Sequence, residues 1–180
     1  IPSHHRGTSA DDGFISLFGR EVFKYDLTET PLTDDLHEAE GPIREAEELA
    51  ADAFGADRSF FLVNGTTCGN EAMIISSVKE GEKILVAENC HKSALMGLII
   101  SGAKPVFIRP SVSTSFRAFS SVTPESVEKA FFEHPDAKAL FLTSPTFHGI
   151  CSDIKSIAEI CRRNDALLLV DEAHGAHFAF

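Results

Sequence analysis

The sequence lacks the features that would place it in a membrane or on a nucleic acid. No run approaches the roughly 18 apolar residues of a membrane-spanning helix, and the richest stretch, residues 94–100, is short and contains a glycine. Only 16 Lys and Arg residues stand against 27 Asp and Glu, so the formal net charge is −11. This acidic balance argues against a nucleic acid or an anionic membrane surface as the main partner.

The chain also lacks an initiator methionine, a signal peptide and paired cysteines. Its N-terminus is polar and basic, without the apolar segment of a signal peptide. The missing methionine suggests a piece of a longer protein. The four cysteines, Cys68, Cys90, Cys151 and Cys161, form no CxxC pair, so we expect free thiols in a reducing compartment, the cytoplasm.

From about residue 41 onward, short apolar runs alternate with segments of helical spacing. The five runs are residues 59–63, 83–87, 105–108, 139–142 and 166–170. The helical segments are residues 43–54, a stretch with Ala72, Met73 and Val78, residues 92–101, a helix that starts at Thr123-Pro124, and residues 154–161. We expect the helix at residues 92–101 to be largely buried, because it is mostly apolar. The runs are continuously apolar, which predicts strands buried on both faces. The sequence therefore predicts an α/β fold, a three-layer sandwich with a mostly parallel sheet.

The first forty residues do not share this alternation. They are polar, with scattered Gly, Pro, Asp and Thr. We interpret residues 1–40 as a loop-like N-terminal arm and residues 41–180 as the α/β domain.

Parallel strands joined by right-handed crossovers have their carboxyl ends at one edge, where ligands bind in such folds. Four segments follow the predicted strands at that edge: residues 64–70, 88–93, 144–149 and 171–177. These segments hold the candidate functional residues.

The segment at residues 64–70, Asn-Gly-Thr-Thr-Cys-Gly-Asn, joins a predicted strand to a predicted helix. Glycines and hydroxyls at a helix N-terminus suit a phosphate group, because free N–H groups and the helix dipole attract anions. The spacing is neither GxxxxGK[ST] nor GxGxxG. A plain strand-to-helix turn explains the segment equally well.

The two other strand-end segments carry a histidine and an aspartate. His91 could stack on a flat ring or move protons, although a helix-capping turn is the better explanation of this residue alone. Asp171 closes a buried strand, and burying its charge is unfavourable without a partner. The partner could be a cation such as a protonated ring nitrogen, or the side chain could cap the next turn. His174, His177 and Glu172 could chelate zinc, but HExxH is absent and the histidine spacing fits no common site, so no metal is predicted.

Together, a phosphate turn, a histidine and a strand-end aspartate in this order resemble a pyridoxal-phosphate site. From about residue 3 to residue 180 the sequence also resembles the major domain of the Orn/Lys/Arg decarboxylase family. The segments that carry this resemblance are residues 26–29, 60–67, 89–93, 101–106 and 170–178.

The resemblance implies a fold-type-I, pyridoxal 5'-phosphate (PLP)-dependent transferase-like large domain, incomplete here, with residues 41–180 as the partial PLP-binding major domain. It implies a cytoplasmic homodimer or larger oligomer that decarboxylates lysine, arginine or ornithine in polyamine biosynthesis. Carried over position by position, the cofactor-binding residues would be Thr66, Thr67, Cys68, Gly69, His91, Thr146, Asp171, Ala173 and His174. The residues implied as catalytic are His91, Asp171 and His174.

By this resemblance, the Thr66–Gly69 turn would hold the cofactor phosphate and His91 would stack on the pyridine ring. Asp171 would pair with the protonated pyridine nitrogen, which lets the ring accept the electron pair released with CO2. Ala173 and His174 would line the ring or the substrate side, and Thr146 lies in another loop at the site's edge.

The chain departs from the family pattern at several places. None of the lysines in this chain matches the family's Schiff-base lysine, whose position in the family pattern falls after residue 180. We therefore expect this piece alone to bind PLP weakly and not to convert substrate. Cys68, Glu88, Phe147 and His148 replace the residues usual at their positions. Two alternatives therefore stay open: another fold-type-I enzyme, such as a lyase or aminotransferase, or a non-catalytic homologue.

Overall fold

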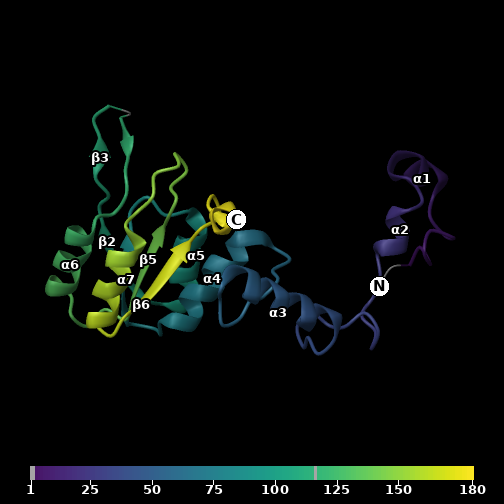
Figure 1. Ribbon diagram of the computed structural model, residues 1–180, viewed down its shortest axis with the longest axis horizontal. Helices are drawn as coiled ribbons and strands as arrows, with labels where there is room; N and C mark the ends of the chain where they lie inside the picture. The colour runs from purple at the N-terminus through teal and green to yellow at the C-terminus, as the bar shows by residue number, and fades with distance from the viewer. Residues whose placement is uncertain (1–2, 116) are drawn as a thin grey trace. The chain divides into compact units, whose positions relative to one another are not determined.

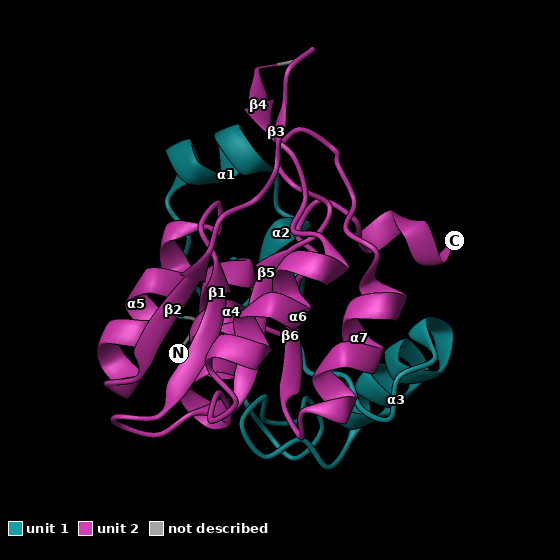
Figure 2. Cartoon of the chain, turned by 90° about the vertical axis from the view of Figure 1, so that its left-hand side faces the viewer, with its two compact units in different colours: residues 1–61 teal, residues 62–180 magenta. Residues whose placement is uncertain are grey.

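The computed structural model describes residues 3–115 and 117–180, so the first two residues of the predicted arm lie outside it. The chain divides into two compact units, Ile1–Phe61 and Leu62–Phe180 (Figure 2). The predicted domain boundary after residue 40 stays a prediction. None of the helices in the described residues is long and apolar enough to cross a membrane.

The first unit contains two short helices that the sequence analysis missed, α1 (Asp12–Phe18) and α2 (Val22–Tyr25). The carboxylate of Asp11 caps α1 by accepting the backbone N–H groups of Gly13 and Phe14. The rings of Phe14 and Phe18 stack one helical turn apart, with centroids 4.8 Å from each other. The prediction of a purely loop-like arm was therefore wrong, because a cap and an i, i+4 aromatic pair suffice for a short helix.

Helix α3 (Pro42–Phe54) ends at Gly55, which has the left-handed φ of 66°. Its N-terminus is capped from a distance by Asp34. Oδ2 of Asp34 accepts the N–H groups of Gly41 at 2.8 Å and Ile43 at 3.0 Å, and Oδ1 accepts that of Glu40 at 3.0 Å. Hydrogen bonds from the backbone N–H groups of Glu40 foremost, and then of Asp35, Gly41 and Arg44, hold the pKa of Asp34 well below its ordinary value of 3.8, although partial burial acts in the opposite direction.

This depressed pKa predicts an acid-sensitive cap. The Asp34→Asn variant keeps a side chain that tolerates the residue's φ of 70° but lacks the charge, so amides at the start of α3 should exchange faster with D₂O at pH 7. A depressed native pKa stabilises the fold above the unfolded value and loses that effect as pH falls toward the native pKa. The difference between variant and wild type should therefore shrink below pH 3.8.

The matched control for this experiment is Asp35→Asn, because the carboxylate of the neighbouring Asp35 accepts the backbone N–H of His37, at 2.8 Å, and none of the N–H groups of α3 in the described part of the chain. Equal exchange in both variants, or a difference from wild type that grows in acid, would show that Asp34 does not stabilise α3 as a charged cap.

The second unit contains a four-stranded sheet in which every neighbouring pair is parallel, in the order β2-β1-β5-β6. The strands are β1 (Lys83–Ala87), β2 (Lys104–Ile108), β5 (Ala139–Thr143) and β6 (Leu167–Asp171). These four correspond to four of the predicted apolar runs. The fifth prediction was wrong: residues 59–63 form no strand, and the side chains from Phe60 to Val63 are 45–79% exposed, since none of the strands in the described residues pairs with this run.

Helices cover both faces of this sheet and make three layers (Figure 1). The helices are α4 (Gly65–Ser77), α5 (Lys92–Ser101), α6 (Pro124–Glu133) and α7 (Ile154–Arg163). On one face Leu140 packs with Phe131 and Ile157, from α6 and α7. On the other, Phe141 packs with Ile74, from α4, and with α5. The predicted three-layer α/β sandwich is thereby confirmed.

Helix α5 is less buried than its apolar sequence predicts. It buries Ala94 and Leu98, whereas Ile99 and Ile100 are exposed. The prediction of a largely buried helix was wrong, because a helix that packs on one side only cannot bury an apolar surface all round.

Gly97 lets α5 pack closely on α4. A Cβ at this position would lie 3.1 Å from Cβ of Ile74 and 3.3 Å from Cα of Glu71. Residues one turn earlier on each helix, Ser93 and Asn70, are consequently brought together.

Two further elements lie beyond the predicted pattern. Strands β3 (Val112–Ser113) and β4 (Ala118–Phe119) pair as a small antiparallel hairpin that projects beyond the sheet (Figures 1 and 2). A 3₁₀ helix, η1 (Ala176–Ala179), follows the segment after β6.

Candidate active site

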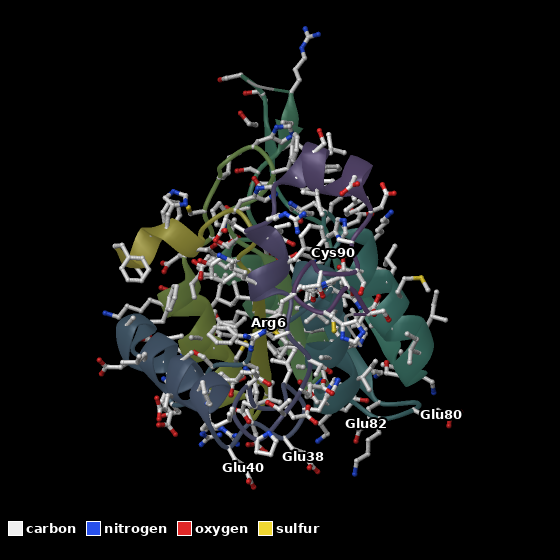
Figure 3. All side chains as sticks on the ribbon, turned by 90° about the vertical axis from the view of Figure 1, so that its right-hand side faces the viewer. Arg6, Glu38, Glu40, Glu80, Glu82 and Cys90 are labelled. Carbon is white, nitrogen blue, oxygen red and sulfur yellow. The ribbon has the colours of Figure 1, made fainter. Side chains whose placement is uncertain are left out.

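The candidate site lies at the carboxyl edge of the parallel sheet. Figure 3 labels Glu80 and Glu82 near the end at which β1 begins, and Cys90 toward the opposite end. Cys90 belongs to the segment that follows β1. Because all four strands run in one direction, the segments that follow β5 and β6 lie at the same edge of the sheet. These are three of the four segments that the sequence analysis selected.

Asp171 is the last residue of β6, and its side chain is only 3% exposed. Oδ2 accepts a hydrogen bond from Nδ2 of Asn70 at 2.8 Å, and Oδ1 accepts one from the backbone N–H of Ala173 at 3.1 Å. Among the described residues, none of the ion pairs involves Asp171. A buried carboxylate with two neutral donors and no cation is an electrostatically incomplete site.

Asn70 connects Asp171 to the segment that contains His91. Its Nδ2 also donates to Oγ of Ser93, at 2.9 Å. Oγ of Ser93 in turn lies 2.8 Å from Nδ1 of His91, and the backbone N–H of Ser93 donates to the same nitrogen at 3.3 Å. Three of the four predicted segments, residues 64–70, 88–93 and 171–177, are thus joined by one chain of hydrogen bonds.

The predicted phosphate turn forms the start of α4. Gly65 opens the helix with a φ of 64°, and Asn64 makes no side-chain capping bond. Helices α5, α6 and α7, by contrast, are capped by the side chains of His91, Thr123 and Asp153. Thr66 and Thr67 are exposed, while Cys68 and Gly69 are partly buried. The first turn of α4 therefore presents N–H groups and hydroxyls suited to an anion.

The loop after β5 packs against the segment after β6. A Cβ at Gly175 would lie 2.6 Å from Cδ of Pro145, so only glycine fits at this contact. Thr146 is buried, and its Oγ1 accepts the N–H of Ile150 at 3.2 Å, which closes its own loop. His174 is exposed, and its ring meets that of Phe147 edge-on at 5.9 Å between centroids.

Cys90 lies close enough to Asp171 to sense its charge. Burial raises the pKa of the Cys90 thiol, and the negative charge of Asp171 raises it further, against the lowering effect of a backbone hydrogen bond. The thiol is accordingly kept neutral, which is the wrong state for a nucleophile. Within the described part of the chain, no group of three or more His, Cys, Asp or Glu side chains is arranged to hold a metal ion.

The sequence analysis missed Asn70 and Ser93 as site residues. Both stand in segments that it selected, and both are buried polar residues one helical turn before a packing residue, Ile74 and Gly97 respectively. The sequence signal that could have identified them is a polar side chain on the buried face of a helix.

The three-layer sandwich with a carboxylate at the end of β6 defines the large domain of a fold-type-I enzyme. The chain superposes on the constitutive lysine decarboxylase of Escherichia coli with a TM-score of 0.83 and 25% identity, over 100% of this chain and 27% of that one. Aspartate aminotransferase from Thermus thermophilus shares the fold alone, with a TM-score of 0.51 and 20% identity over 60% of this chain and 28% of that chain.

The chain belongs to the Orn/Lys/Arg decarboxylase family, whose major-domain profile matches residues 1–180. It is 46% identical over 180 residues to an arginine decarboxylase of Halalkalibacterium halodurans, covering all of this chain and 37% of that relative. It is 30% identical over 188 residues to lysine decarboxylase LdcA of Pseudomonas aeruginosa, covering 98% of this chain and 25% of that relative. The chain thus spans 37% of the length of two of the arginine decarboxylases that it matches from end to end.

Proposed function

We propose that the full-length protein containing this chain is a PLP-dependent decarboxylase of a basic amino acid. The observation that carries the proposal is the buried carboxylate of Asp171, bonded at 2.8 Å to Asn70, the residue that directly follows the Thr66–Gly69 turn. Membership of the family supports the same chemistry.

The residues at this edge fit the cofactor's two charged ends. Asp171 lacks a cationic partner among the described residues, and a protonated pyridine nitrogen is such a partner. The α4 N-terminus lacks a side-chain cap and suits a phosphate. The α4 N-terminus starts at Gly65, and Asn70, further along the same helix, contacts Asp171 on β6. One small molecule with a cationic ring and an anionic tail therefore suits the site.

Each residue then has a simple task. Bound PLP supplies an electron sink for the electron pair that is released when CO2 leaves the substrate. Asp171 holds the proton on the pyridine nitrogen, and the Thr66–Gly69 turn binds the phosphate through N–H groups and hydroxyls. His91 orients the ring by stacking on it, while Ala173, His174 and Thr146 line the surrounding edge.

We propose arginine as the preferred substrate, because four relatives named arginine decarboxylase are 41–46% identical to the chain. The lysine decarboxylase LdcA is 30% identical to it, and the biodegradative arginine decarboxylase of Escherichia coli is 29% identical. A cytoplasmic homodimer or larger oligomer, active in polyamine biosynthesis, belongs to the same proposal. The exposed apolar side chains of α5, among them Ile99 and Ile100, support association.

The test is a product assay on the full-length protein. With PLP present, we expect CO2 and the corresponding amine from arginine, with kcat/KM at least about tenfold above that for lysine or ornithine. Protein freed of PLP serves as the control and should be inactive. Transfer of the amino group to a keto acid without CO2 would indicate an aminotransferase, and no reaction with any of the three would indicate a non-catalytic homologue.

A further inference from the structure

Asn70 is the most constrained polar residue of the site. Its side chain is 1% exposed, and both N–H groups of its amide are used, one on Asp171 and one on Ser93. The orientation of the amide is determined by its neighbour, because an ionised carboxylate only accepts hydrogen bonds, so the amide nitrogen must face Asp171.

The amide oxygen of Asn70 is buried and has no hydrogen-bond partner in the described part of the chain. An unpaired buried acceptor destabilises a fold, so packing alone would favour an apolar side chain at this position. The asparagine compensates for this loss with the two hydrogen bonds that it donates. Its presence is therefore explained by what those bonds hold in place.

The same order of donors and acceptors extends to His91. Because Oγ of Ser93 accepts from Asn70, its single hydroxyl hydrogen remains to be donated to Nδ1 of His91 at 2.8 Å. The backbone N–H of Ser93 points to the same nitrogen. Nδ1 is thereby the acceptor, the neutral ring carries its hydrogen on Nε2, and the plane of the imidazole is set from one edge.

We propose that Asn70 and Ser93 are positioning residues, which through one chain of hydrogen bonds hold both the carboxylate that meets the cofactor's ring nitrogen and the imidazole that stacks on the ring. The inference rests on the proposed function. It adds to that function a coupling between two groups, of which one would meet the ring nitrogen and the other the ring face. The close packing of Gly97 on Ile74 keeps the two helices at the separation that this chain of bonds requires.

The test compares Ser93→Ala and Asn70→Leu with a matched control, Ser101→Ala, in the full-length protein. Ser101 lies at the other end of α5, and its hydroxyl forms hydrogen bonds with the backbone of Leu98 and Ala103, within and just after the same helix. We expect Ser93→Ala to raise the dissociation constant for PLP, measured by equilibrium dialysis, about tenfold, and Asn70→Leu to raise it further. Ser101→Ala should equal wild type.

Two more measurements separate positioning from a structural role. In both variants kcat should fall about tenfold or more while KM for the amino acid stays within about twofold, since the bonds act on cofactor-facing groups. The double variant should lose less than the product of the single losses, because both residues act in one chain. Unfolding of the apoprotein reports whether each variant folds, and if Asn70→Leu does not, the comparison of Ser93→Ala with Ser101→Ala decides.

The outcomes distinguish the inference from the function beneath it. Wild-type protein that retains no PLP would overturn both. Wild type that binds PLP, with Ser93→Ala and Asn70→Leu equal to it in dissociation constant and kcat, would overturn the positioning role alone. Fully multiplicative losses in the double variant would likewise show that the two residues act separately.

Discussion

Replacing Asp171 with alanine is expected to lower the decarboxylation rate of the full-length protein by about a thousandfold. In the proposed site, no carboxylate at the end of β6 would then hold the proton on the ring nitrogen, and a neutral pyridine would accept the released electron pair poorly. The fold should survive, because the loss leaves two donors unpaired, the amide of Asn70 and the backbone N–H of Ala173, at a cost of about 1–3 kcal/mol each. Steady-state kinetics and circular dichroism measure the two effects.

A matched control is Asp52→Ala, the same substitution at an exposed position of α3, which should leave the rate unchanged. Activity of Asp171→Ala within tenfold of wild type would remove the carboxylate from the mechanism. Loss of folded structure in that variant would instead assign Asp171 a structural role.

The largest expected effect on stability comes from Phe141→Ala. Phe141 lies in the middle of β5 and is 0% exposed, packed beneath α4 and α5. Truncation removes most of a buried ring and leaves a cavity that the neighbouring strands cannot fill, which should lower the free energy of unfolding by about 3–5 kcal/mol. Urea unfolding of the full-length protein, followed by circular dichroism, measures the change.

Phe132→Ala is the control for that loss, because Phe132 on α6 is 87% exposed. Its effect should stay within about 0.5 kcal/mol. Equal effects of the two substitutions would mean that the face of the sheet beneath α4 and α5 is not a tightly packed core.

The parts of the fold that the sequence predicted are those with a strong local signal. The apolar runs at β1 and β5 became the two central strands, buried along almost their whole length. The Thr123-Pro124 start of α6 is confirmed by a capping box, in which Oγ1 of Thr123 accepts the N–H of Ser126 at 3.3 Å. In each case residues close in sequence carried the information.

The predictions that failed depended on whether another element packs against the segment. The run at residues 59–63 is as apolar as a central strand, yet none of the strands that the structure describes pairs with it. Helix α5 is apolar on all sides, yet it packs on one. Hydrophobicity measures how favourable burial would be, and only the tertiary structure decides whether a partner surface is present.

The same division applies to the site. The sequence alone determined which chemical groups stand at the carboxyl edge: a glycine- and threonine-rich helix start, His91 and Asp171, each just after a predicted strand. The tertiary structure decided that these groups form one unit, through hydrogen bonds that join residues 101 and 23 positions apart. Such bonds depend on how closely α5 packs on α4 at Gly97, a distance set by the whole sandwich rather than by any local stretch of sequence.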